Sequence, residues 1–172
     1  MFGGEKTKPG DYPFAALLGQ TVLRPSQTYI GGTRAPATKQ PSWVCAGTLI
    51  NYWYVVTAAH CIGAGRKRIS HLRLGEWEVG NFGSGSAQID RDGLPLVQDF
   101  RITQSDIVVH ENYKKKFRNI ENDIALIRLP RKVELNFGVQ FACLPVPGTE
   151  NIAEVGNWNS GVDGKEATLI MW

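Results

Sequence analysis

The chain has 172 residues, of which 42% are hydrophobic and 20% are charged. This is the composition of a globular domain, and it excludes a mainly disordered chain. The 19 Lys and Arg residues stand beside 16 Asp and Glu residues and leave a net charge of +3, so the charge implies no nucleic-acid partner. No apolar run approaches the roughly 18 residues that a membrane-spanning helix needs, so no membrane segment is expected.

Residues 1–19 lack the basic region and apolar core of a signal peptide. Along the rest of the chain, β-rich runs alternate with turn residues and helical periodicity is almost absent, which favours an all-β antiparallel barrel or sandwich. The segments expected to be strands are 14–18, 44–50, 54–58, 71–74, 98–109, 124–128 and 153–156. The segments expected to be surface loops are 24–41, 83–86 and 92–93, because they are rich in turn-forming residues.

Two clusters of cations, Arg66-Lys67-Arg68 and Lys114-Lys115-Lys116, are expected in such loops. We interpret them as solvated turns. The alternative is a site for a polyanion or an acidic partner.

The stretch 43–62, WVCAGTLINYWYVVTAAHCI, carries the first candidate site. Its second β-rich run ends just before His60, so we expect a strand to deliver this histidine at its end. Cys45 and Cys61 lie on the two sides of a hairpin-like connection, which can bring their Cα atoms to the roughly 5.5 Å that a disulfide needs. We therefore predict a Cys45–Cys61 disulfide that fixes the backbone beside His60.

The second candidate site is in the stretch 122–129, NDIALIRL. Asp123 precedes an aliphatic run that we interpret as a strand buried on both faces. A carboxylate in such a place needs a hydrogen-bond partner, and the Nδ1 hydrogen of a histidine would satisfy it. The alternative is that Asp123 only caps a loop.

Together, Thr57-Ala58-Ala59-His60-Cys61 and Asn122-Asp123-Ile124-Ala125-Leu126 resemble the two motifs of the trypsin-like (chymotrypsin-fold, S1) serine peptidases. The resemblance continues over most of the chain. Further matching segments are Phe2-Gly3-Gly4, Cys45-Ala46-Gly47-Thr48-Leu49-Ile50, Leu74-Gly75-Glu76 and Val109-His110-Glu111-Asn112-Tyr113. The resemblance implies a two-barrel antiparallel β fold and a secreted, extracellular serine endopeptidase that acts on protein or peptide substrates without a cofactor. His60 would be the general base and Asp123 the carboxylate that orients it.

The sequence departs from the family at the nucleophile, because the family's Gly-Asp-Ser-Gly-Gly motif is not present. Ser160 is the only serine after Asp123, and we interpret it as a loop residue. We therefore expect a partial peptidase domain, with the first barrel complete at about 14–130 and the second barrel incomplete at 131–172. We expect these 172 residues to be inactive on their own.

The third cysteine is read through the same resemblance. Cys143-Leu144-Pro145 resembles the position at which clip-domain proteases and related peptidases are disulfide-linked to their cleaved prodomain. Its partner would then lie upstream of Met1, and the alternative is a free thiol. Glu5-Lys6-Thr7-Lys8-Pro9-Gly10 and Leu74-Gly75-Glu76-Trp77-Glu78 are also similar to segments of the clip-domain subgroup.

The sequence gives weaker support for other kinds of site and function. The three histidines and three cysteines lack the paired spacing of a zinc site, so no metal site is expected. Glu76 and Glu78 lie in a loop where some family members bind calcium, and we interpret them as solvated carboxylates. Two further functions stay open: a non-catalytic serine-protease homologue that acts as a binding or regulatory module, and a basic module for polyanions.

Overall fold

The computed structural model describes residues 7–24, 29–30, 33–34, 38–62, 68–76, 96–116 and 119–144. The chain divides into two units, Met1–Ala142 and Cys143–Trp172, and of the second unit only Cys143 and Leu144 are described. The described part is mostly β, as predicted, with one short α-helix and one 3-10 helix. No helix within it has the length and apolar character needed to span a membrane.

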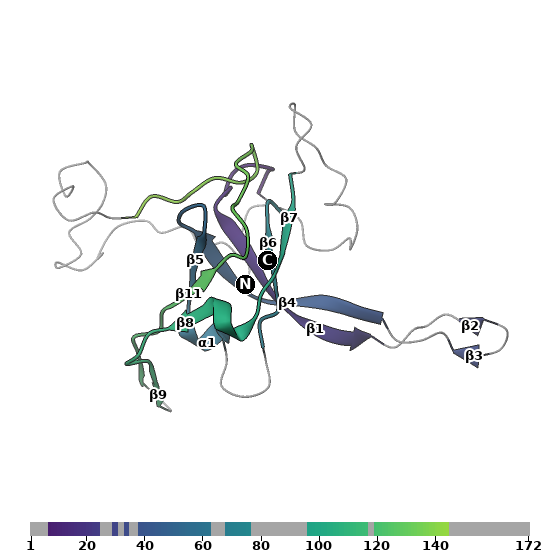
Figure 1. Cartoon of the computed structure of the whole chain (residues 1–172), viewed down its shortest axis with the longest axis horizontal. Coiled ribbons are helices and arrows are strands. Elements are labelled where there is room, and N and C mark those ends of the chain that lie inside the picture. Colours follow the sequence, from purple (N-terminus) through teal and green to yellow (C-terminus); the bar gives the residue numbers. More distant parts are fainter. Residues whose placement is uncertain are drawn as a thin grey trace. The chain divides into compact units, whose positions relative to one another are not determined.

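The first unit is built on a seven-stranded antiparallel sheet in the order β7-β6-β1-β4-β5-β11-β8. The two outermost strands, β7 and β8, are consecutive in the chain, so the sheet curls round on itself (Figure 1). Two small hairpins, β2–β3 and β9–β10, lie outside this sheet. The strands are β1 (Ala15–Arg24), β2 (Tyr29–Ile30), β3 (Thr33–Arg34), β4 (Thr38–Leu49), β5 (Tyr54–Thr57), β6 (His71–Leu74), β7 (Gln98–Arg101), β8 (Ile107–Val109), β9 (Lys114–Lys116), β10 (Asn119–Glu121) and β11 (Ala125–Arg128). The helices are α1 (Ala59–Ile62) and the 3-10 helix Gln104–Asp106.

Alternating burial along the strands makes the hydrophobic core. In β5 and β6 every second residue is buried, and β7 shows the same period of two. The inward side chains form one cluster, whose largest fully buried members include Leu18, Leu49, Leu72, Leu74 and Ile127. Val133 and Val139, which follow the last strand, are buried in the same cluster. The division into two barrels near residue 130 stays a prediction.

β1 and β4 form a much longer hairpin than the sequence predicted. Their pairing runs from Ala15↔Thr48 to Arg24↔Thr38, and β2 and β3 also fall within the segment 24–41 that was expected to be a loop. That prediction was wrong because turn-forming residues do not exclude a two-stranded ribbon. Pro41 lies in this part of β4, opposite Thr21, where the strand's second neighbour β5 is not paired with it.

The segment 98–109, expected to be one strand, is broken into β7 and β8. Between them Thr103 and Asp106 close a 3-10 turn: the Thr103 N–H donates to Asp106 Oδ2 at 2.8 Å, and the Asp106 N–H donates to the Thr103 carbonyl at 3.1 Å. A side chain that bonds the backbone three residues away competes with the ladder of a sheet. The break lets the chain turn from one edge of the sheet to the other.

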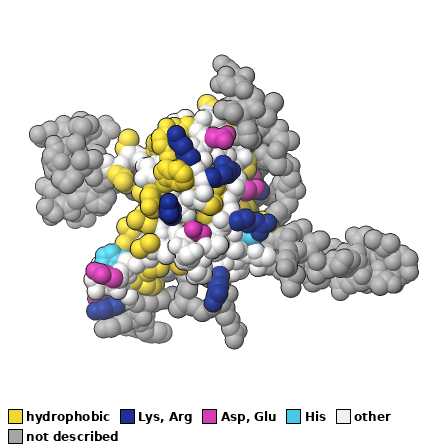
Figure 2. All heavy atoms as spheres, in the orientation of Figure 1, with side chains coloured by type: hydrophobic (Ala, Val, Ile, Leu, Met, Phe, Trp, Pro, Cys, Tyr) yellow, Lys and Arg dark blue, Asp and Glu magenta, His cyan; other side chains and the backbone are white. Residues whose placement is uncertain are grey.

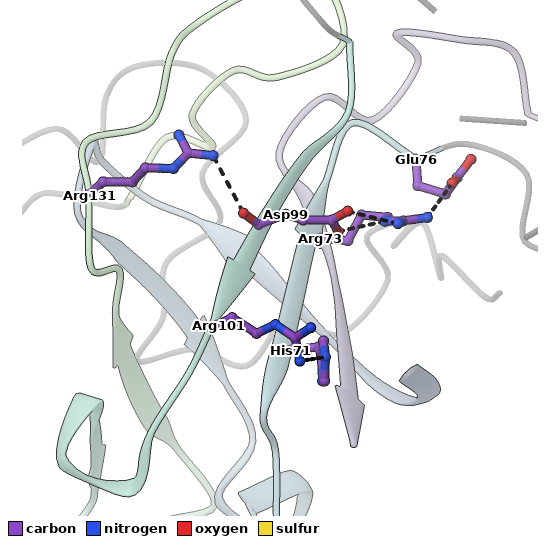
Figure 3. Close-up of polar contacts among 6 residues, drawn as sticks. All are labelled: His71, Arg73, Glu76, Asp99, Arg101 and Arg131. Carbon is purple, nitrogen blue, oxygen red and sulfur yellow. Dashed lines mark hydrogen bonds and ion pairs between the residues drawn. The ribbon is translucent and has the colours of Figure 1, made fainter. Parts of the chain in front are cut away.

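β6 and β7 are held together on their outer face by a cluster of charged side chains (Figure 3). Arg73 donates two hydrogen bonds to Asp99, of 2.7 and 2.8 Å, and a third of 3.2 Å to Glu76. At the next pair on the same face, His71↔Arg101, the Arg101 guanidinium contacts Nε2 of His71. The bidentate pair of Arg73 and Asp99 fixes the register of the two strands.

The remaining strand predictions had mixed outcomes. The strand 71–74 is confirmed, whereas 14–18 and 44–50 fall, except for Phe14 and Ile50, within longer strands. The segment 153–156 lies outside the described residues, as do the loops 83–86 and 92–93. Lys114–Lys116 forms strand β9 and not a loop, because it pairs with β10. On the face drawn in Figure 2, Lys and Arg side chains are spread out and do not form a single block.

Candidate functional site

His60 lies in the one-turn helix α1, directly after strand β5. The sequence predicted a strand over 54–58 that delivers this histidine at its end; β5 ends at Thr57, one residue earlier, and α1 begins at Ala59. Ala59, Cys61 and Ile62 are buried in this turn. The imidazole of His60 therefore points outward, with 48% of its side chain exposed.

A disulfide joins this turn to strand β4. It links Cys45 to Cys61, with the two Cα atoms 5.9 Å apart, and these are the two cysteines that the sequence pairs. Because Cys61 directly follows His60, the cross-link fixes the backbone on the C-terminal side of the imidazole.

Asp123 lies in the tight connection between β10 and β11. Asn122 has a positive φ of 54°, a conformation that asparagine tolerates better than most residues. Its side chain donates to the Asn112 carbonyl at 3.0 Å, which fixes the turn. The pairing of β11 with β5, which begins at Ala125↔Thr57, then brings Asp123 beside the turn that carries His60.

The Asp123 carboxylate contacts His60 through both of its oxygens. Oδ2 lies 2.7 Å from the imidazole Nδ1, and Oδ1 accepts the backbone N–H of His60 at 2.8 Å. The hydrogen bond from His60 holds the pKa of Asp123 below its usual range, so the carboxyl is ionised at neutral pH. An ionised carboxylate at Nδ1 places the imidazole proton there and leaves Nε2 as the acceptor.

The alternative that Asp123 only caps a loop does not describe this geometry. The expected burial of the strand on both faces was wrong, however. In β11 only Ala125 and Ile127 are buried, whereas Arg128 is exposed. The charge of Asp123 is tolerated because it is hydrogen-bonded and partly exposed, with 26% of its side chain accessible.

Sequence reasoning missed the second contact of the pair, the His60 backbone N–H. Every residue other than proline has this donor, so no residue type signals it. Asn122 carried a signal that could have been used, because asparagine before the aspartate permits the left-handed turn that presents the carboxylate.

The described residues include one group of potential metal ligands, Cys45, His60 and Cys61, whose ligand atoms lie within 4.8 Å of one another. Cys61 Sγ is 3.7 Å from Nε2 of His60. Both sulfurs belong to the disulfide, so they cannot act as the thiolates that a zinc site needs.

Other residues were singled out in the sequence for separate candidate sites. Cys143 has a free, exposed thiol. Ser160, Lys67 and Glu78 lie outside the described residues. Glu76, expected to be solvated, is instead 8% exposed and paired with Arg73.

Comparisons with known proteins agree on one family. The family model described as Trypsin matches residues 2–168. Phenoloxidase-activating factor 3 of Holotrichia diomphalia is 41% identical over 151 residues, which are 86% of this chain and 38% of that protein. The CLIP domain-containing serine protease HP8 of Bombyx mori is 34% identical over 149 residues, which are 84% of this chain and 35% of that protein.

Among solved structures, the Drosophila Grass clip serine protease of the Toll pathway matches with a TM-score of 0.57 and 26% identity. The match covers 86% of this chain and 37% of that one, so the chain spans less than two fifths of the length of each of these three relatives. The resemblance read from the sequence is confirmed, and so is the chymotrypsin-like fold. The chain belongs to the trypsin family of serine proteases and is close to the clip-domain members of that family.

Proposed function

We propose that His60 and Asp123 are the general base and its orienting carboxylate in a serine endopeptidase domain. The observation that carries this proposal is the double contact of Asp123 with the imidazole Nδ1 at 2.7 Å and with the His60 N–H at 2.8 Å. It supports one orientation of the ring, with the proton on Nδ1. The outward-facing Nε2 is then free to accept a proton from a nucleophile.

In this mechanism Nε2 takes the proton of a serine hydroxyl while the serine oxygen attacks the carbonyl of a peptide bond. The imidazolium that forms is stabilised by Asp123 and then donates its proton to the leaving amine. The serine would come from a Gly-Asp-Ser-Gly-Gly motif, which these 172 residues do not contain. We therefore propose that this polypeptide alone does not hydrolyse peptides.

Proteins are the proposed substrates, and a proteolytic cascade outside the cell is the proposed setting. Several relatives have names that describe activating or processing steps, such as the two phenoloxidase-activating factors of Holotrichia diomphalia and the Spaetzle-processing enzyme of Drosophila melanogaster. The disulfide next to His60 fits an oxidising compartment.

The inactivity of the 172-residue polypeptide can be tested with a peptide ester, which is a more reactive substrate than an amide. We expect hydrolysis at the rate of buffer alone. The matched control is His60→Ala, which removes the proposed base. Hydrolysis by the wild-type polypeptide that disappears in His60→Ala would show that a nucleophile is present after all.

The alternative that the sequence leaves open is a non-catalytic homologue that binds or regulates other proteins. The nucleotide sequence of the transcript discriminates the two. A Gly-Asp-Ser-Gly-Gly motif encoded in frame after Trp172 supports the peptidase, and glycine in place of its serine supports the homologue.

A further inference from the structure

Thr57 lies in β5 and contacts both neighbouring strands, β4 and β11, close to the His60 site. It is the last residue of β5, three positions before His60, and only 8% of it is exposed. Its backbone is paired with Ala125, two positions after Asp123. Its hydroxyl donates a hydrogen bond of 2.7 Å to the carbonyl of Ala46, which follows Cys45 of the disulfide.

The hydroxyl acts where the ladder between β4 and β5 has ended. That ladder contains the pairs Leu49↔Val55 and Thr48↔Val56, and Ala46 and Thr57 lie beyond its last pair. The Thr57–Ala46 bond therefore extends the contact between the two strands toward the site.

Gly47 allows the strands to come close enough for this bond. A Cβ atom at Gly47 would lie 2.7 Å from Cγ1 of Val55 and 3.0 Å from the Val56 carbonyl oxygen. The backbone of β4 is thus pressed against β5 immediately beside Ala46, within reach of the Thr57 hydroxyl.

The two contacts of Asp123 depend on how α1 sits against β11. Both are short, at 2.7 and 2.8 Å, so a small shift of either segment would lengthen them. The disulfide fixes α1 only after His60, through Cys61. On the N-terminal side of His60, the chain enters the turn from Thr57. Without the hydrogen bond between the Thr57 hydroxyl and Ala46, the backbone at this point could shift.

We propose that Thr57 is a positioning residue for the His60–Asp123 pair, because its hydroxyl holds β5 to β4 through Ala46 while its backbone pairs β5 with β11. This inference rests on the function proposed above for His60 and Asp123. It predicts that the Thr57 hydroxyl controls which nitrogen of His60 carries the proton, because a carboxylate out of line at Nδ1 releases the imidazole to the Nε2–H form that free histidine favours.

The test is nitrogen NMR of the full 172-residue chain labelled with ¹⁵N-histidine, at a pH where His60 is neutral. We expect the wild-type chain and Thr57→Ser to hold the proton on Nδ1. We expect Thr57→Val and Thr57→Ala to shift the tautomer toward Nε2–H. Thr and Val have the same shape, and Ser and Ala differ by one oxygen, so the two pairs isolate the hydroxyl even where one variant fails to fold. Thr48→Val, a half-buried threonine opposite Val56 in the β4–β5 ladder, makes the same chemical change at a different hydroxyl of the same ladder.

The possible results test the His60–Asp123 pair and the role of Thr57 separately. A wild-type His60 with its proton on Nε2 would contradict the proposed catalytic pair itself. A wild-type Nδ1–H form that persists in folded Thr57→Val and Thr57→Ala would overturn only the role of Thr57, which would then be structural. A shift in Thr48→Val as large as in Thr57→Val would overturn it as well.

Discussion

His60 and Asp123 form a pair because one carboxylate satisfies two donors of the same histidine. The ring nitrogen alone would leave the imidazole free to rotate about its side-chain bonds, whereas the second bond, from the backbone N–H, ties the carboxylate to the main chain at His60. The backbone as well as the side chain of His60 therefore holds the carboxylate at Nδ1.

We expect acid to weaken the contacts between Asp123 and His60 by protonating the Asp123 carboxylate. The hydrogen bond from His60 lowers the pKa of Asp123 from its usual 3.8. The folded state therefore binds this proton less readily than the unfolded chain, and the resulting stability is present above pH 3.8 and is lost as the pH falls through the folded-state pKa. Urea unfolding between pH 5 and pH 2 should show this loss. Asp123→Asn should flatten the curve in this range, and an unchanged curve would contradict the assignment.

We expect His71 to change the stability of the fold in a different range of pH. Burial and then the Arg101 cation lower its pKa from the usual 6.5. The unfolded chain consequently takes up this proton first, so stability should fall as the pH drops from 6.5 toward the folded-state pKa. Arg101→Gln removes a repelling charge and should weaken this dependence. His110→Gln is the matched control, since His110 is exposed. An Arg101→Gln chain with the wild-type pH dependence would contradict the contact.

At the scale of elements, the site stands on three separate segments: β4 with Cys45, the β5–α1 turn and the β10–β11 turn. The disulfide ties the first two, and the β5–β11 ladder ties the last two. None of the three segments could position the imidazole alone, because each contact crosses from one segment to another.

Removing the disulfide tests this arrangement. Cys45→Ala with Cys61→Ala should lower the free energy of unfolding by about 3 kcal/mol, the value typical for a loop of this size. Chemical denaturation of the variant and the wild-type chain measures the difference, and the reduced wild-type chain should lose a similar amount. A loss well below 1 kcal/mol would show that the non-covalent contacts alone hold the turn.

The sequence predicted the local features of this site better than its long-range ones. His60, Asp123 and the two cysteines stand in recognisable surroundings, and β6 has a clear alternation that the structure repeats. The β1–β4 ribbon was missed because its pairing joins residues far apart in the chain, such as Thr21 and Pro41, and because proline is depleted in strands. The break at Thr103–Asp106 was missed although Thr103 and Asp106 have the spacing of a capping box, a pattern that predicts the start of a helical turn.

At the scale of the whole molecule, the chain provides a curled sheet that carries two members of a proposed triad. Its relatives are more than twice as long, and their names include activating and processing factors. The remaining questions therefore concern what this sheet is joined to and what supplies the nucleophile.

The exposed thiol of Cys143 provides a test of what the sheet is joined to. We expect it to form a disulfide with an upstream prodomain in the protein produced from the complete reading frame. After activation cleavage, the two chains should stay together on a non-reducing gel and separate when reduced. Cys143→Ser should separate them without reduction. A Cys143 thiol that reacts with iodoacetamide in the native, unreduced protein would contradict the link.

The most direct test of the central claim is steady-state hydrolysis of a peptide substrate by the activated protein from the complete reading frame. The claim that His60 is the base held by Asp123 predicts measurable hydrolysis at neutral pH, with kcat reduced on the order of 10⁴-fold by Asp123→Asn and at least as much by His60→Ala. Hydrolysis that survives His60→Ala, or a complete protein that hydrolyses nothing, would contradict it.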